Sequence, residues 1–352
     1  MQKTILLLCL VFLVPDLFSQ EISTETDSTI LATDDQMAEL KYNESIELYR
    51  EGLLDSAMHR LNDALQRKPD FYQALYNRAQ IRHELNDYAG AMEDYNSAID
   101  KQPTGKVYFG RGLSRLYLGD LNGSIEDFTQ AISLNPNFPE AYYYRGGARF
   151  KLDEYQNAKD DYTRAISLKS NYAYAYQDRG SANWMLGKPK EALEDYYKAT
   201  LFDPTLAFAF NNMGLIRKEL KEYEEAVTDF TAAVKINPEY YYAYNNRGTA
   251  LYELGKYDEA LKDYNQALSL NPKYLPALNN RGNAWFKLKE YRKAIADYDE
   301  ILKVSQDDGE IYLNRGIARE MLRDDKGACR DWDKALSLGV EIAGEYLKTC
   351  EK

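Results

Sequence analysis

A glycine recurs every 34 residues along most of this 352-residue chain, and ordinary globular domains have no such period. Alanines repeat with the same spacing in two further columns, and an aromatic residue repeats in a third. A fixed period of this length indicates one small unit that is repeated and stacked, because a single unit cannot bury its own apolar face. The glycines are Gly112, Gly146, Gly180, Gly214, Gly248, Gly282 and Gly316.

Residues 241–274 show what one unit encodes. Apolar and small residues fall at i, i+4 and i+7 in its first half, which predicts a helix with one buried stripe, made of Tyr244, Gly248 and Leu251. A matching stripe in the second half predicts a second helix, and it consists of Ala260, Tyr264 and Ala267. Pro272 ends that helix, since a residue before proline disfavours helical geometry.

This pattern resembles the tetratricopeptide-repeat (TPR) family, whose helix-turn-helix unit has small residues at positions 8, 20 and 27 and proline at position 32. The resemblance implies an all-α fold, a right-handed α-solenoid, that serves as a non-enzymatic protein interaction scaffold. We expect nine repeats over 38–340 and a capping helix over 341–352. The repeats are 38–71, 72–104, 105–138, 139–172, 173–206, 207–240, 241–274, 275–308 and 309–340.

The first residues carry the features of an export signal. Residues 1–19 combine a short polar start, an apolar run and a small residue at the end, which is typical of a secretory signal peptide. Residues 20–37 are acidic and carry no aromatic residue, so we expect a flexible leader there. The pattern predicts secretion across the inner membrane to the periplasm or cell envelope, with no membrane insertion after signal cleavage.

The charge of the chain and the motifs that it lacks exclude several classes of function. The formal net charge is −12 and the acidic residues are spread along the chain, which argues against nucleic acid or an anionic membrane as partner. The two histidines, His59 and His83, and the three cysteines show no metal-ligand spacing, and no phosphate-binding glycine loop or nucleophile motif is present. We therefore expect no cofactor and no catalytic site, and a protein or peptide as partner. The sequence does not give the oligomeric state.

Two cysteines lie near the C-terminus, on either side of an expected turn at residues 338–340. If the flanking segments run antiparallel, Cys329 and Cys350 face each other and can form a disulfide in an oxidising compartment. Two free buried thiols are the alternative.

Position 7 of the repeat is arginine in most units, and position 23 is aspartate from the second unit on. These positions flank the packed residues, so we expect structural ion pairs such as Arg247 with Asp263 and Arg281 with Asp297. The alternative is an anion-binding stripe of arginines without aspartate partners. Met213 interrupts the arginine column, which would leave Asp229 without its natural partner.

Asparagines gather at positions 5 and 6 of the first helix in repeats six to nine. In TPR solenoids this face lines a concave groove, and the arrangement is similar to the asparagine ladder in the TPR superhelix of O-linked N-acetylglucosamine transferases. A side-chain amide both donates and accepts, so such a ladder can pair with the backbone of an extended peptide. The alternative is that these amides brace nearby helices. The predicted peptide-binding residues are Asn211, Asn212, Asn245, Asn246, Asn279, Asn280, Asn283 and Asn314.

Aromatic residues fall on the same face of the first helices. Tyr242, Tyr252 and Phe286 belong to the predicted peptide-binding set, and Phe109 and Trp184 extend the stripe toward the N-terminus. An exposed aromatic stripe is typical of a binding surface. It also supports the alternative function, a binding protein for carbohydrate or another small ligand.

Overall fold

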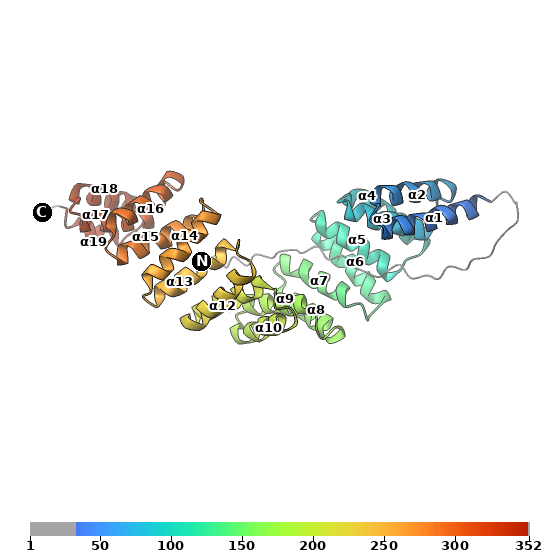
Figure 1. Ribbon diagram of the computed structural model, residues 1–352, viewed down its shortest axis with the longest axis horizontal. Coiled ribbons are helices and arrows are strands. Elements are labelled where there is room, and N and C mark those ends of the chain that lie inside the picture. The colour runs from blue at the N-terminus through green and yellow to red at the C-terminus, as the bar shows by residue number, and fades with distance from the viewer. Residues whose placement is uncertain (1–32, 351–352) are drawn as a thin grey trace. The chain divides into compact units, whose positions relative to one another are not determined.

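The computed structural model describes residues 33–350 and is all-α within them (Figure 1). The predicted signal peptide and residues 20–32 of the predicted leader lie outside the described residues. Eighteen helices form successive helix-turn-helix pairs, and a short nineteenth follows. The helices are α1 (Asp34–Arg50), α2 (Leu54–Arg67), α3 (Tyr72–Glu84), α4 (Tyr88–Lys101), α5 (Gly105–Tyr117), α6 (Leu121–Leu134), α7 (Pro139–Lys151), α8 (Tyr155–Leu168), α9 (Ala173–Met185), α10 (Pro189–Phe202), α11 (Ala207–Glu219), α12 (Tyr223–Ile236), α13 (Tyr241–Glu253), α14 (Tyr257–Leu270), α15 (Leu275–Lys287), α16 (Tyr291–Val304), α17 (Gly309–Met321), α18 (Asp325–Ser337) and α19 (Ala343–Leu347).

The described part of the chain divides into two compact units, one that ends at Ala192 and one that begins at Leu193. Inside each unit the two helices of a repeat pack against each other, and the second helix packs on the first helix of the next repeat. Helices α13, α14 and α15 in the second unit show this order (Figure 1). The expected all-α solenoid of paired helices is confirmed.

The helix boundaries follow the repeat register closely. From α3 to α17 every first helix begins at the first residue of its expected repeat. The chain ends differ from expectation. Helix α1 begins at Asp34, inside the expected leader, because Thr33 and Gln36 form a capping box that starts the helix early. At the other end α19 holds five residues, which is shorter than the capping helix expected over 341–352.

The recurrent glycine is explained by the ring that packs on it. A Cβ atom placed on Gly248 would lie 2.7 Å from Cε1 of Tyr264, and one on Gly282 would lie 2.8 Å from Cε1 of Tyr298. Both rings are almost fully buried. The two helices of a repeat can therefore approach closely only if position 8 carries no side chain or a very small one.

None of the helices between residues 33 and 350 combines the length and apolar character needed to cross a bilayer.

Candidate functional site

The arginines at position 7 are engaged by aspartates of their own repeat. Arg247 Nε and Nη2 lie 2.8 and 2.7 Å from the two carboxylate oxygens of Asp263, and Arg281 holds Asp297 in the same way at 2.9 and 2.5 Å. Such two-point contacts are among the stronger polar interactions in proteins. The same pairing joins Arg78 to Asp94, Arg111 to Asp127, Arg145 to Asp161 and Arg315 to Asp331.

The third donor of each arginine reaches the preceding repeat. Arg247 Nη1 donates to Thr231 at 3.2 Å, and Arg281 Nη1 donates to Asn265 at 2.8 Å. Each guanidinium thus ties its own repeat together and also ties it to the one before. These arginines are structural links. An anion-binding stripe would need arginines without aspartate partners, and these arginines are paired with aspartates.

A second arginine, at position 11, supports the aspartate in several repeats. Arg82 Nη1 lies 2.9 Å from Asp94, and Arg149 Nη1 lies 2.8 Å from Asp161. The arginine at position 11 also provides a partner for Asp229, which has none at position 7. Asp229 is bound by Arg217 Nη1 at 2.7 Å. Arginine at position 11 is visible in the sequence and could have identified this substitute partner.

One arginine does not fully offset the burial of Asp229. Burial raises the pKa of this carboxyl to about 6, while Arg217 acts in the opposite direction. The folded state therefore binds a proton more tightly than the unfolded state, and stability falls as pH rises from about 4 to about 6.

Restoring the missing arginine should remove the contribution of Asp229 to this pH dependence. Met213→Arg recreates the two-arginine arrangement of repeat two, in which Arg78 and Arg82 both bind Asp94, so we expect the free energy of unfolding at pH 7 to rise by about 1–2 kcal/mol and to vary less between pH 4 and 6. Denaturant titrations at several pH values measure both effects. An unchanged pH profile in the variant would show that Asp229 does not cause it.

The asparagines form hydrogen bonds between successive first helices. Asn246 Nδ2 donates to Asn211 Oδ1 at 3.0 Å, and Asn280 Nδ2 donates to Asn245 Oδ1 at 2.9 Å. In each case position 6 of one repeat reaches position 5 of the repeat before. Asn212 Nδ2 donates to the Tyr196 hydroxyl at 3.1 Å. Asn211, Asn212 and Asn245 are 4–6% exposed, so these three amides brace the repeats.

The hydrogen bonds between asparagines of successive repeats do not continue at Asn279. Its Oδ1 atom is buried and has no hydrogen-bond partner within residues 33–350, and Asn314, which occupies the donor position of the next repeat, makes no bond to it. Asn283 is engaged elsewhere, since it accepts a hydrogen bond of 2.7 Å from the Tyr298 hydroxyl. Among the predicted asparagines, Asn279 thus offers an unused acceptor in a buried setting.

The aromatic residues do not form one exposed stripe. Phe109 and Trp184 are buried, contrary to expectation, and Phe109 packs on the rings of Phe128 and Phe138. These two side chains therefore contribute to the packing of the repeats and not to an exposed surface. The predicted binding residues Tyr242, Tyr252 and Phe286 are half-buried and pack edge-on against Tyr274, Tyr257 and Tyr291 respectively.

A similar contact occurs in the first unit, whose first helices carry no asparagine pattern. The Tyr143 hydroxyl donates to Asp178 at 2.8 Å, which joins the same two positions with the donor now at position 5 and the acceptor at position 6 of the next repeat. Burial raises the pKa of Asp178 to about 6. The pair was not predicted, because Asp178 belongs to neither the asparagine pattern nor the aromatic pattern of this face.

The two C-terminal cysteines are joined. Cys329 and Cys350 form a disulfide with their Cα atoms 6.0 Å apart, which fixes the last residues to α18. Trp332 and Tyr346 pack beside it, with ring centroids 5.1 Å apart. The short C-terminal segment thereby covers the end of the final repeat.

No cluster of three or more potential metal-ligating His, Cys, Asp or Glu side chains occurs in the part of the chain that the structure describes.

Comparison with protein families gives repeated matches along the chain. Profiles described as tetratricopeptide repeat match residues 42–106, 139–172, 241–274 and 276–308, and one described as TPR repeat matches 112–153 and 214–255. Together these matches cover more than half of the chain. A comparison with curated protein sequences finds no match.

Solved structures show the same fold at low sequence identity. A tetratricopeptide repeat protein from Parabacteroides merdae is 23% identical, with a TM-score of 0.51, over 70% of this chain and 99% of that one. PilF of Pseudomonas aeruginosa is 17% identical, with a TM-score of 0.52, over 57% of this chain and 91% of that one. The profile matches and the paired helices lead to one conclusion: this chain belongs to the tetratricopeptide-repeat family.

Proposed function

We propose that this protein is a non-enzymatic scaffold or adaptor of the cell envelope, which binds an extended segment of another protein on the asparagine-bearing face of repeats six to nine. Membership of a family of interaction scaffolds supports the binding role. The acidic net charge of −12 fits a protein partner better than a nucleic acid.

The observation that carries the proposed binding site is the buried Oδ1 atom of Asn279. A buried acceptor without a partner costs about 1–3 kcal/mol, so rotation of the Asn279 side chain toward a ligand N–H group recovers this free energy on binding. The backbone of an extended peptide offers such groups at regular intervals. Asn280 and Asn314, which are half-buried, lie near Asn279 in the repeat register and can extend the contact.

Two features support a location outside the cytoplasm. Residues 1–19 have the pattern of a secretory signal, and the Cys329–Cys350 disulfide fits an oxidising compartment such as the periplasm.

A substitution at Asn279 tests the binding site directly. Leucine occupies the same position in the next repeat as Leu313, so Asn279→Leu should fold with an unchanged or higher melting temperature. We expect it to weaken binding of an extended polypeptide at least tenfold, because the acceptor is lost. Reduced, carboxymethylated α-lactalbumin is a suitable probe, and biolayer interferometry with the purified chain from residue 20 onward gives the affinity.

The matched control is Asn245→Leu. This variant removes the acceptor for Asn280, so its melting temperature should fall, in contrast to Asn279→Leu. Equal probe binding by the wild type and Asn279→Leu would contradict the proposed site. Loss of binding in proportion to lost stability in both variants would assign the asparagines to bracing alone.

A further inference from the structure

In most repeats an aromatic ring at position 4 packs against the arginine at position 7. Tyr108 and Arg111 show this contact, with the guanidinium carbon 5.5 Å from the ring centroid. Such cation–π contacts become stronger as they are removed from water. The equivalent pairs are Tyr142 with Arg145, Tyr176 with Arg179, Tyr244 with Arg247 and Tyr312 with Arg315, at 5.3–5.6 Å.

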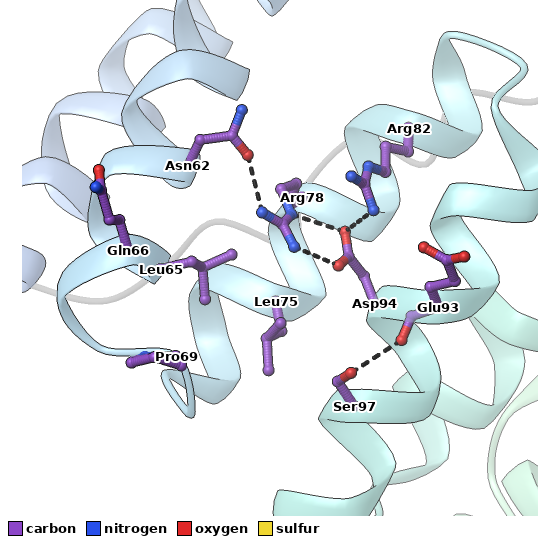
Figure 2. Close-up of a pocket in the computed structure, with 10 residues that line it drawn as sticks. All are labelled: Asn62, Leu65, Gln66, Pro69, Leu75, Arg78, Arg82, Glu93, Asp94 and Ser97. Atoms are coloured by element: carbon purple, nitrogen blue, oxygen red, sulfur yellow. Dashed lines mark hydrogen bonds and ion pairs between the residues drawn. The ribbon is translucent and has the colours of Figure 1, made fainter.

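Repeat two lacks this ring. Leu75 stands at position 4, although Arg78 keeps the other contacts of its column, with two hydrogen bonds to Asp94 and one of 2.8 Å to Asn62. A cavity of about 510 Å³ lies beside this arginine, between α2 and α4. Figure 2 shows Leu75 and Arg78 on α3, between the residues of α2 and those of α4.

The lining of the cavity suits a ring with one polar end. Leu65 and Leu75 are buried and form an apolar base, while the rim carries the exposed polar residues Asn62, Gln66, Glu93 and Ser97. The hydrogen bonds of Arg78 lie in the guanidinium plane, which leaves the face of the group for stacking. A phenol ring can thus stack on Arg78 and place its hydroxyl at the polar rim.

We propose that this cavity binds a tyrosine side chain presented by a partner polypeptide, whose ring takes the place that Tyr108 takes in the next repeat. The assignment rests on the proposed role as a protein interaction scaffold and names a second contact for it. It is independent of the asparagine face, because all lining residues belong to repeats one and two. The volume of the cavity falls within the range of known ligand pockets, about 300–1,000 Å³.

Repeat eight supplies a matched control. Its position 4 is Leu278, next to Arg281, but its position 11 is Trp285, whose ring packs into the core cluster that contains Leu278. In repeat two the same position is Arg82, which lines the cavity and is bound to Asp94. The same leucine-to-tyrosine change can therefore be made in the lining of this cavity and at a position outside it.

The experiment is an NMR titration of arginine Nε–H signals in the full mature chain, with Arg78 assigned through Arg78→Lys. The probes are p-cresol, a blocked Gly-Gly-Tyr-Gly-Gly peptide and the same peptide with leucine in place of tyrosine. We expect p-cresol and the tyrosine peptide to shift the Arg78 signal saturably, and the tyrosine peptide to bind at least tenfold more tightly than the leucine peptide. Leu75→Tyr should abolish these shifts, whereas Leu278→Tyr should retain them.

The proposal is overturned if no probe gives a saturable shift, or if Leu75→Tyr binds as the wild type does. Binding of p-cresol together with rejection of the tyrosine peptide would overturn the assignment to a polypeptide side chain. If Leu75→Tyr does not fold, Gln66→Trp covers the cavity from its exposed rim and should abolish the shifts in its place. Asn279→Leu should leave every one of these shifts unchanged, so failure of either site is recognised separately.

Discussion

Replacing Arg281 with alanine should lower the stability of repeat eight by about 3–5 kcal/mol, the usual cost of leaving a buried carboxylate without its partner. Asp297 is 5% exposed and receives both of its arginine hydrogen bonds from Arg281. Position 11 of this repeat is Trp285, so among the described residues no second arginine takes over. The loss of the Asn265 contact to the preceding repeat adds to the effect.

The control is Arg78→Ala in repeat two. Asp94 keeps Arg82 at 2.9 Å, so we expect roughly half the loss seen with Arg281→Ala. Native-state hydrogen exchange of α3–α4 and α15–α16 is the suitable measurement, because stacked repeats open locally and a single unfolding transition averages over them. The double variant Arg281→Ala/Asp297→Ala should recover part of the stability. Equal losses at Arg78 and Arg281 would contradict the supporting role of position 11.

The paired helices could be predicted from the sequence because their signals are local. Glycine at position 8 marks where a ring must pack, and the aspartate at position 23 lies 16 residues from the arginine it binds, within the same unit. The early start of α1 was also encoded locally, in the Thr33 and Gln36 capping box, but the acidic composition of the leader obscured it. Patterns inside one unit are readable from a single sequence.

The asparagine face was harder to predict because its contacts join different repeats. A helical wheel places Asn245 outside the buried stripe of its own helix, yet Asn280 of the next repeat covers it. The link spans 35 residues, one more than the period, so it becomes apparent only when neighbouring repeats are stacked. The cavity beside Arg78 was hard to predict for the same reason. The lack of an aromatic ring at Leu75 becomes apparent only when this position is compared with Tyr108 and its equivalents in other repeats.

Removal of the C-terminal disulfide should destabilise the final repeat by about 3 kcal/mol, since the crosslink restricts a loop of about 20 residues in the unfolded chain. In a stack of repeats the terminal unit has a neighbour on one side only, so this loss is concentrated in α17–α19. The surroundings of the buried Trp332 ring, against which Tyr346 packs, should change when the crosslink is removed.

The measurement is hydrogen exchange of α17–α19 in the wild type, with and without dithiothreitol, and in Cys329→Ser/Cys350→Ser. Reduction should speed exchange in the wild type to the rate of the double variant, and it should leave the double variant unchanged. A count of free thiols tests the proposed location, because only export to an oxidising compartment lets the bond form in the cell. Protein recovered from the envelope should therefore contain no free thiol, whereas chain retained in the cytoplasm without residues 1–19 should contain two. Two free thiols in the envelope form would remove the support that the disulfide gives to secretion.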